Sequence, residues 1–164
     1  MLSVRLAIAA ILIAASVGTA HAQDPASRIV GAWRITGFVR SGISGQAEKV
    51  YGEKPVGHWL FTKGGHTIAL TVAEHRQKPA GAPMTDAERA HLHRTMYAFS
   101  GTYTVVGTKL TVRWEASWND AWTGGEQTHE ITIIGNKLSI ITLPFKSMAD
   151  GYEQVVAATF ERVE

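Results

Sequence analysis

The sequence predicts an all-β domain in which eight antiparallel strands form a closed up-and-down barrel, with one helix inserted between strands three and four. Eight segments are rich in β-branched and aromatic residues, and short glycine-containing turns separate most of them. Only one segment carries the start signal and composition of a helix. We expect the sheet to close on itself, because a long open edge would promote aggregation.

The eight predicted strands are joined mostly by connections of hairpin length, which favour antiparallel neighbours. Turn signals such as Lys63-Gly64-Gly65 and Ile134-Gly135-Asn136 mark where strands end. The predicted strands span residues 28–40, 56–63, 66–74, 99–106, 109–118, 126–134, 137–145 and 153–163.

The inserted helix is predicted at about residues 86–97. Thr85 followed three residues later by Glu88 is a capping-box pattern, and Pro83 disfavours helix upstream of it. The preceding residues 74–83, with two prolines, predict a surface loop that leads into the helix.

The first 22 residues have the layout of a secretory signal peptide. Arg5 precedes an apolar run, and the segment ends in Ala20-His21-Ala22, which predicts cleavage after Ala22. The rival interpretation is a retained membrane anchor, but the apolar run is short for a span of about 20 residues. We therefore expect a mature domain of residues 23–164 that is soluble and periplasmic or secreted, without a membrane association after signal removal.

The composition narrows the possible functions. Without Arg5 the formal charge is +1, from 15 Lys and Arg against 14 Asp and Glu, and neither sign clusters, so no nucleic-acid partner is expected. The chain has no cysteine, which excludes disulfides, thiol catalysis and thiolate metal sites. One domain of about 140 residues is long enough for a single core.

Trp33 is predicted to be a structural residue. On the first strand it alternates onto the face that we expect to point inward, together with Ile35, Gly37 and Val39. In a closed barrel the first and last strands are neighbours, so Arg162 can reach the Trp33 ring and form a cation–π contact.

The Gly31-Ala32-Trp33 motif, with Arg162 in the last strand, resembles the glycine–tryptophan and arginine pair of lipocalins. The blocks "IVGAWRI", "PVGHWLFTKGGHTIAL", "FSGTYTV", "VRWEASWNDAWTGGEQTHEITIIGNKLSI" and "FERV" are similar, in that order, to the bacterial and fungal lipocalin-like domain family. This resemblance covers nearly all of the expected mature chain. It implies an eight-stranded barrel with a cavity for a small molecule and implies no defined reaction.

The fifth and sixth predicted strands hold the densest set of polar residues. Arg113 and Glu115 alternate on one face, and a simple hairpin register places Gln127 and His129 near them. If this face points inward, the four side chains form a polar cluster on the cavity wall. If it points outward, they are solvated and the Trp114 row lines the interior.

Trp118 and Trp122 flank a loop with two glycines and are candidates for stacking on a flat or apolar ligand at the barrel mouth. The alternative is that they only cover the barrel end. The histidines do not predict a metal site, because His91 and His93 would point in different directions on a helix. We expect neither a metal nor a cofactor.

Three functions are compatible with the sequence. The first is binding of a small hydrophobic or amphipathic ligand by Arg113, Glu115, Trp118, Trp122, Gln127 and His129. The second is an isomerase or cyclase in which Glu115 or His129 acts as acid or base on a hydrophobic substrate. The third is a module that binds a partner protein.

Overall fold

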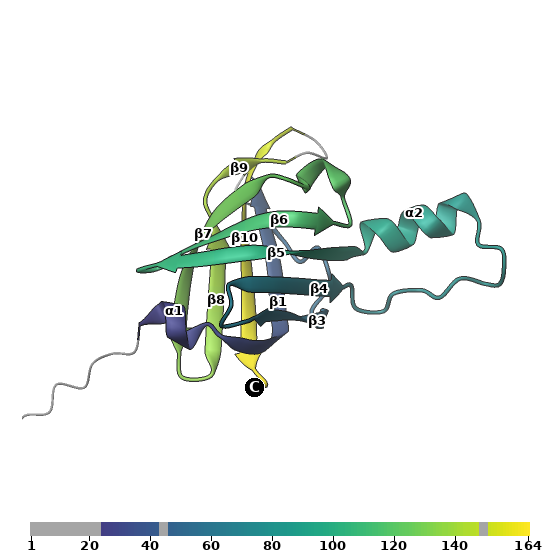
Figure 1. Ribbon diagram of the computed structural model, residues 1–164. Helices are drawn as coiled ribbons and strands as arrows, with labels where there is room; N and C mark the ends of the chain where they lie inside the picture. The colour runs from purple at the N-terminus through teal and green to yellow at the C-terminus, as the bar shows by residue number, and fades with distance from the viewer. Residues whose placement is uncertain (1–23, 43–45, 148–150) are drawn as a thin grey trace, which may run out of the picture.

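In the computed structural model, which describes residues 24–42, 46–147 and 151–164, eight long strands form one closed antiparallel barrel (Figure 1). The first and last strands, β1 (Gly31–Gly42) and β10 (Glu153–Arg162), pair with each other and close the sheet. The other long strands pair in chain order: β3 (Val56–Phe61), β4 (His66–Val72), β5 (Met96–Val106), β6 (Lys109–Ser117), β7 (Glu126–Ile134) and β8 (Lys137–Thr142). The predicted up-and-down barrel is confirmed.

The two ends of the barrel differ in their connections. At one end, which we call the closed end, β1 begins, β10 ends and the hairpins are tight. At the other, the long-loop end, the connections are longer and carry two short strands, β2 (Ala47–Glu48) and β9 (Phe145–Lys146), which pair with β1 and β10. Space for a ligand is therefore expected at the long-loop end.

The inserted helix, α2 (Asp86–Arg94), projects away from the barrel wall (Figure 1). Its predicted place between strands three and four is not matched, because β2 adds a strand before it and α2 lies between β4 and β5. The helix is also shorter than predicted, since the chain enters β5 at Met96.

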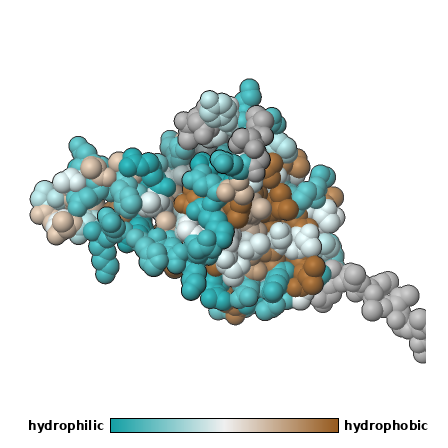
Figure 2. Space-filling model, turned by 180° about the vertical axis from the view of Figure 1, so that it is seen from behind, coloured by the Kyte–Doolittle hydropathy of each residue, from teal (hydrophilic) through white to brown (hydrophobic). Residues whose placement is uncertain are grey.

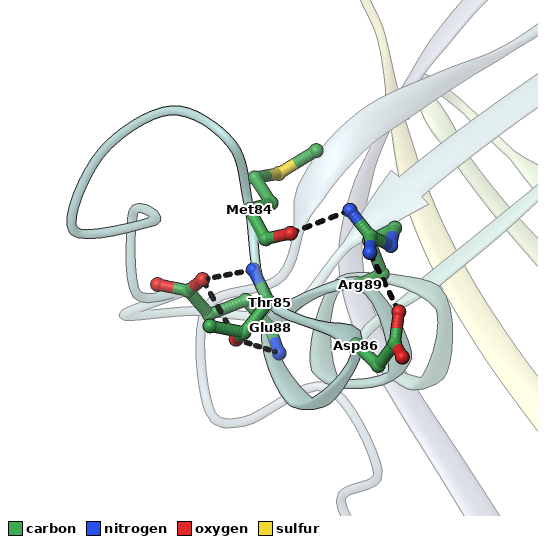
Figure 3. Close-up of polar contacts among 5 residues, drawn as sticks. All are labelled: Met84, Thr85, Asp86, Glu88 and Arg89. Carbon is green, nitrogen blue, oxygen red and sulfur yellow. Dashed lines mark hydrogen bonds and ion pairs between the residues drawn. The ribbon is translucent and has the colours of Figure 1, made fainter.

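The start of α2 is a complete capping box (Figure 3). Thr85 Oγ1 accepts a hydrogen bond from the Glu88 backbone N–H at 3.2 Å, and the Glu88 carboxylate accepts from the Thr85 backbone N–H at 2.7 Å. Arg89 donates to the Met84 carbonyl and pairs with Asp86 at 2.6 Å. These local contacts define the helix start although α2 buries no residue completely.

Trp33 closes the barrel at the closed end. Its side chain is 0% exposed, and its indole Nε1 donates to the Ile29 carbonyl at 2.7 Å. The Arg162 guanidinium lies over the ring, 4.1 Å from its centroid, as predicted from the pairing of the first and last strands.

Arg162 also fastens the segment that precedes β1. Its guanidinium donates to the Val30 carbonyl at 2.8 Å and to the Arg28 carbonyl at the end of the short helix α1 (Pro25–Arg28). Gly31 has a φ of +130°, and a Cβ there would lie 2.2 Å from the Glu164 carbonyl oxygen. Only glycine therefore allows the start of β1 to pass this close to the backbone of Glu164. The predicted first strand was too long, since residues 28–30 lie in or beside α1.

A β-bulge in β1 changes which side chains face inward. Thr36 and Gly37 together oppose Thr159, so the alternation shifts by one residue after Ile35. Phe38 and Arg40 consequently point to the interior. The prediction that Gly37 and Val39 share the inner face with Trp33 was wrong, because strict alternation fails across a bulge.

The outer wall is less polar than strict alternation predicts. Four apolar side chains of β3 and β4 are exposed: Val56, Leu60, Ile68 and Leu70. Figure 2 shows further hydrophobic residues on the barrel seen from behind, whereas α2 and its loop are mostly hydrophilic. Within the part of the chain that the structure describes, no helix is long and apolar enough to span a membrane.

Candidate functional site

A cavity of about 320 Å³ occupies the barrel interior and reaches the long-loop end. This volume lies at the lower end of the range of about 300–1,000 Å³ for small-molecule sites. Its inner part is formed mainly by apolar side chains that point inward from the strands: Ile35, Phe38, Trp59, Ala69, Ile140, Ala158 and Phe160. The interior is therefore incompletely filled by side chains of the barrel itself.

An aromatic wall, made of Tyr97, Trp114, Trp118 and Trp122, stands at the long-loop end. The Trp118 and Trp122 rings meet edge to face at 4.8 Å, and Tyr97 lies 5.5 Å from Trp118 and 5.6 Å from Trp122 between ring centroids. Trp122 also lies against Trp114 at 5.0 Å. Close contacts between aromatic rings hold the rings in fixed orientations.

The local chain explains why these tryptophans lie where they do. The Asn119 side chain caps the 3₁₀ turn η1 (Asp120–Trp122) by accepting from the Ala121 backbone N–H at 3.3 Å. Trp118 Nε1 donates to the His93 carbonyl at 3.1 Å, and a ring nitrogen of His93 contacts the Trp118 carbonyl at 3.3 Å. The end of α2 and the β6–β7 loop are thus joined beside the cavity.

His129 is a buried titratable group on the cavity wall. Its side chain is 4% exposed, and its ring meets Trp59 edge to face at 6.2 Å between centroids. Loss of water around the ring lowers the pKa of His129 to about 4, so the imidazole is neutral at neutral pH. Its Nδ1 is covered and has no hydrogen-bond partner among residues 24–42, 46–147 and 151–164.

The charged residues that line the cavity are all basic. They are Arg40 and Arg94, with His93 and His129 as the titratable histidines, and no Asp or Glu from the described ranges lines it. Arg40 forms an ion pair with Glu48 at 2.6 Å. Tyr51 lies nearby, and burial raises the pKa of its hydroxyl to about 12, an effect that Arg40 partly offsets.

Four of the six predicted ligand-binding residues line the cavity: Trp118, Trp122, Gln127 and His129. The other two, Arg113 and Glu115, are exposed on the outer face of β6. Of the two placements considered from the sequence, Arg113 and Glu115 therefore adopt the one in which they face solvent.

The inward-facing cluster of Arg113, Glu115, Gln127 and His129, one of the two placements that the sequence left open, is not formed. The hairpin pairs Val112 with Gln127 and Leu110 with His129, so Gln127 and His129 share the inner face with the apolar row of β6. A shift of one residue in register moves a side chain to the opposite face of a sheet, and the simple register assumed from the sequence was off by one.

Glu115 and His129 therefore do not lie together as a pair that could transfer a proton. Glu115 is the extra residue of a second bulge, between the pairs Ser100–Ala116 and Gly101–Trp114, and it faces solvent. His129 lies inside the barrel, separated from it by the sheet. The isomerase or cyclase hypothesis is not favoured by this geometry.

Phe38, Arg40 and Tyr51 are among the cavity residues that sequence reasoning missed. The first two reach the interior only because of the β1 bulge, for which Gly37 is a weak signal. Tyr51 lies between β2 and β3, where no periodic pattern predicts an orientation.

Comparison with known proteins agrees with this architecture. A family model described as "lipocalin-like domain" matches residues 30–163. None of the curated proteins compared with the sequence matches it.

Two crystal structures from Bacteroides are similar to the chain. A lipocalin-like protein from Bacteroides uniformis is 15% identical, with a TM-score of 0.45, and the match covers 82% of this chain and 97% of that one. An uncharacterized protein from Bacteroides eggerthii is 14% identical, with a TM-score of 0.42, covering 81% and 98%.

Proposed function

The chain belongs to the lipocalin-like domain family, and from this we propose that it binds a small apolar or amphipathic molecule in the barrel cavity. The observation that supports the proposal most directly is the unfilled interior of about 320 Å³, with an apolar inner part and aromatic rings at the long-loop end. Such a lining favours an apolar ligand body through burial of its surface.

The proposal is tested by titrating the purified protein with N-phenyl-1-naphthylamine, an uncharged fluorophore whose emission rises in apolar surroundings. We expect saturable binding at micromolar probe. Native mass spectrometry after mild purification reports any molecule that is carried along from the cell. If no saturable binding occurs below millimolar probe, the cavity does not act as a binding site.

A matched pair of variants in β10 locates the site. Ala158 is 5% exposed and lines the cavity, whereas its neighbour Ala157 faces the outer side of the same strand. Ala158→Leu places three additional carbon atoms in the cavity, and we expect it to weaken probe binding at least tenfold. Ala157→Leu makes the same change outside and is expected to leave the affinity unchanged.

Thermal melting of both variants shows whether the barrel is intact. Because Ala158→Leu fills empty space, we expect it to fold with a melting temperature close to that of the wild type. Equal probe affinities for the two variants would place the binding site outside the cavity.

We further propose that the protein acts in the periplasm or outside the cell. The support is the sequence of residues 1–22, which lie outside the described residues. Expression in a bacterial host should yield a mature protein whose mass corresponds to an N-terminus at Gln23. A full-length mass in the cytoplasmic fraction would contradict this.

A further inference from the structure

His129 faces the cavity with hydrogen-bonding capacity that the protein leaves unused. Its Nδ1 is covered, and no described residue offers it a hydrogen-bond partner. The other ring nitrogen, Nε2, is not completely covered and makes no hydrogen bond to the part of the chain that the structure describes. Since His129 lines the cavity, Nε2 is the nitrogen that a bound molecule can reach.

The position of the ring proton follows from this asymmetry. If the proton were on Nδ1, an N–H donor would be buried without any acceptor. With the proton on Nε2, the covered nitrogen is an acceptor and the N–H group points to the cavity. A neutral imidazole carries its proton on one nitrogen only, and buried N–H donors without a partner are rare. The Nε2–H form is the one that this site favours.

Two uncharged polar residues lie next to His129 on the wall formed by β7 and β8. Thr142 is its direct partner across β7 and β8 and lines the same cavity, and Thr142 Oγ1 accepts from the Val156 backbone N–H at 2.8 Å, which leaves its O–H free to donate. Gln127 lies two residues away on the same face. The charged lining residues Arg40 and Arg94 are less deeply buried than His129.

We propose that the inner end of the ligand carries an uncharged oxygen acceptor, such as a carbonyl, ether or hydroxyl oxygen, to which His129 Nε2–H donates a hydrogen bond. This inference rests on the proposed function and specifies the chemistry of the ligand. A polar group of this kind gives the unused donor a partner at the otherwise apolar inner wall. A purely hydrocarbon ligand would leave that donor dry and unpaired, which is unfavourable.

A charged group is a poor fit at this end of the cavity. The surroundings disfavour ionisation of His129 itself, as the lowered pKa of its ring indicates. A carboxylate bound beside His129 and Thr142 would meet a neutral imidazole and a hydroxyl, and Arg40, which lines the same cavity, is already paired with Glu48. A buried charge without a counter-charge of its own is costly.

The test compares two probes of the same shape. 2-Acetylnaphthalene carries a carbonyl oxygen where 2-isopropenylnaphthalene carries a CH₂ group. Both affinities are measured for the wild type and for His129→Phe, by displacement of N-phenyl-1-naphthylamine. For each protein we take the ratio of the two affinities. Comparing this ratio between the wild type and the variant cancels the effect of the difference in hydrophobicity between the probes.

We expect the preference for the ketone to be about fivefold greater in the wild type than in His129→Phe, the size of one neutral hydrogen bond. His58→Phe is the matched control, because His58 is exposed on the outer face of β3, and it should keep the wild-type ratio. If His129→Phe also keeps the wild-type ratio while both probes bind, the inference is wrong and the proposed function stands. If neither probe binds the wild type, the proposed function itself fails.

Long-range ¹H–¹⁵N spectra of the wild-type protein give a readout that does not depend on a variant. We expect the neutral Nε2–H form of His129 in the free protein and in the 2-acetylnaphthalene complex, with a change in the Nε2 shift on binding. A ring protonated on Nδ1, or on both nitrogens in the complex, would overturn the assignment.

Discussion

Trp33→Ala is expected to lower the free energy of unfolding by about 3–5 kcal/mol, the usual cost of deleting a fully buried aromatic side chain. The change removes a ring that is 0% exposed, its hydrogen bond to the Ile29 carbonyl and the surface on which the Arg162 guanidinium lies. Urea denaturation at neutral pH, followed by circular dichroism, measures the difference.

Trp122→Ala is the control for this prediction, since it makes the same substitution at the opposite end of the barrel. Trp122 is only half-buried and borders the cavity, so its loss removes less packing. We expect a smaller loss of stability from Trp122→Ala than from Trp33→Ala. Equal midpoints for Trp33→Ala and the wild type would show that the closed end does not depend on this ring.

The closed end was predictable from sequence because its contacts follow from topology. Closure of the sheet makes the first and last strands neighbours, so Trp33 near the start of one and Arg162 near the end of the other lie at the same end of the barrel. Gly31 lies at this end too. The short helix α1 was not predicted, since its four residues, Pro25–Arg28, offer too short a pattern.

The cavity wall was only partly predictable because small irregularities decide which side chains face it. One extra residue in β1 turns Phe38 and Arg40 inward, and the hairpin register of β6 and β7 separates His129 from Glu115. Alternation in the sequence is the same with and without such a shift, so both placements remained possible. Burial against neighbouring strands selects between them.

Lowering the pH from about 7.5 to about 4.5 is expected to reduce the free energy of unfolding of the wild type by about 2–3 kcal/mol more than that of His129→Phe. The unfolded chain binds a proton at His129 near the usual pKa of 6.5, whereas the folded protein resists protonation down to about 4. Between these values the unfolded state binds more protons, so its free energy falls as the pH falls. The contribution of the neutral His129 ring to the free energy of unfolding is complete above about pH 6.5 and is lost as the pH falls towards 4.

Urea denaturation of both proteins at the two pH values gives the change in the free energy of unfolding with pH for each, and the effect is the difference between these two changes. Carboxylates such as Glu74 and Glu130, whose pKa values are lowered by hydrogen bonds, also titrate in acid, but they are the same in both proteins and cancel. His58→Phe should show the same loss of stability as the wild type, because His58 is exposed. If the wild type and His129→Phe lose equal stability, the His129 ring titrates as it would in water, and the cavity wall around it is hydrated rather than dry.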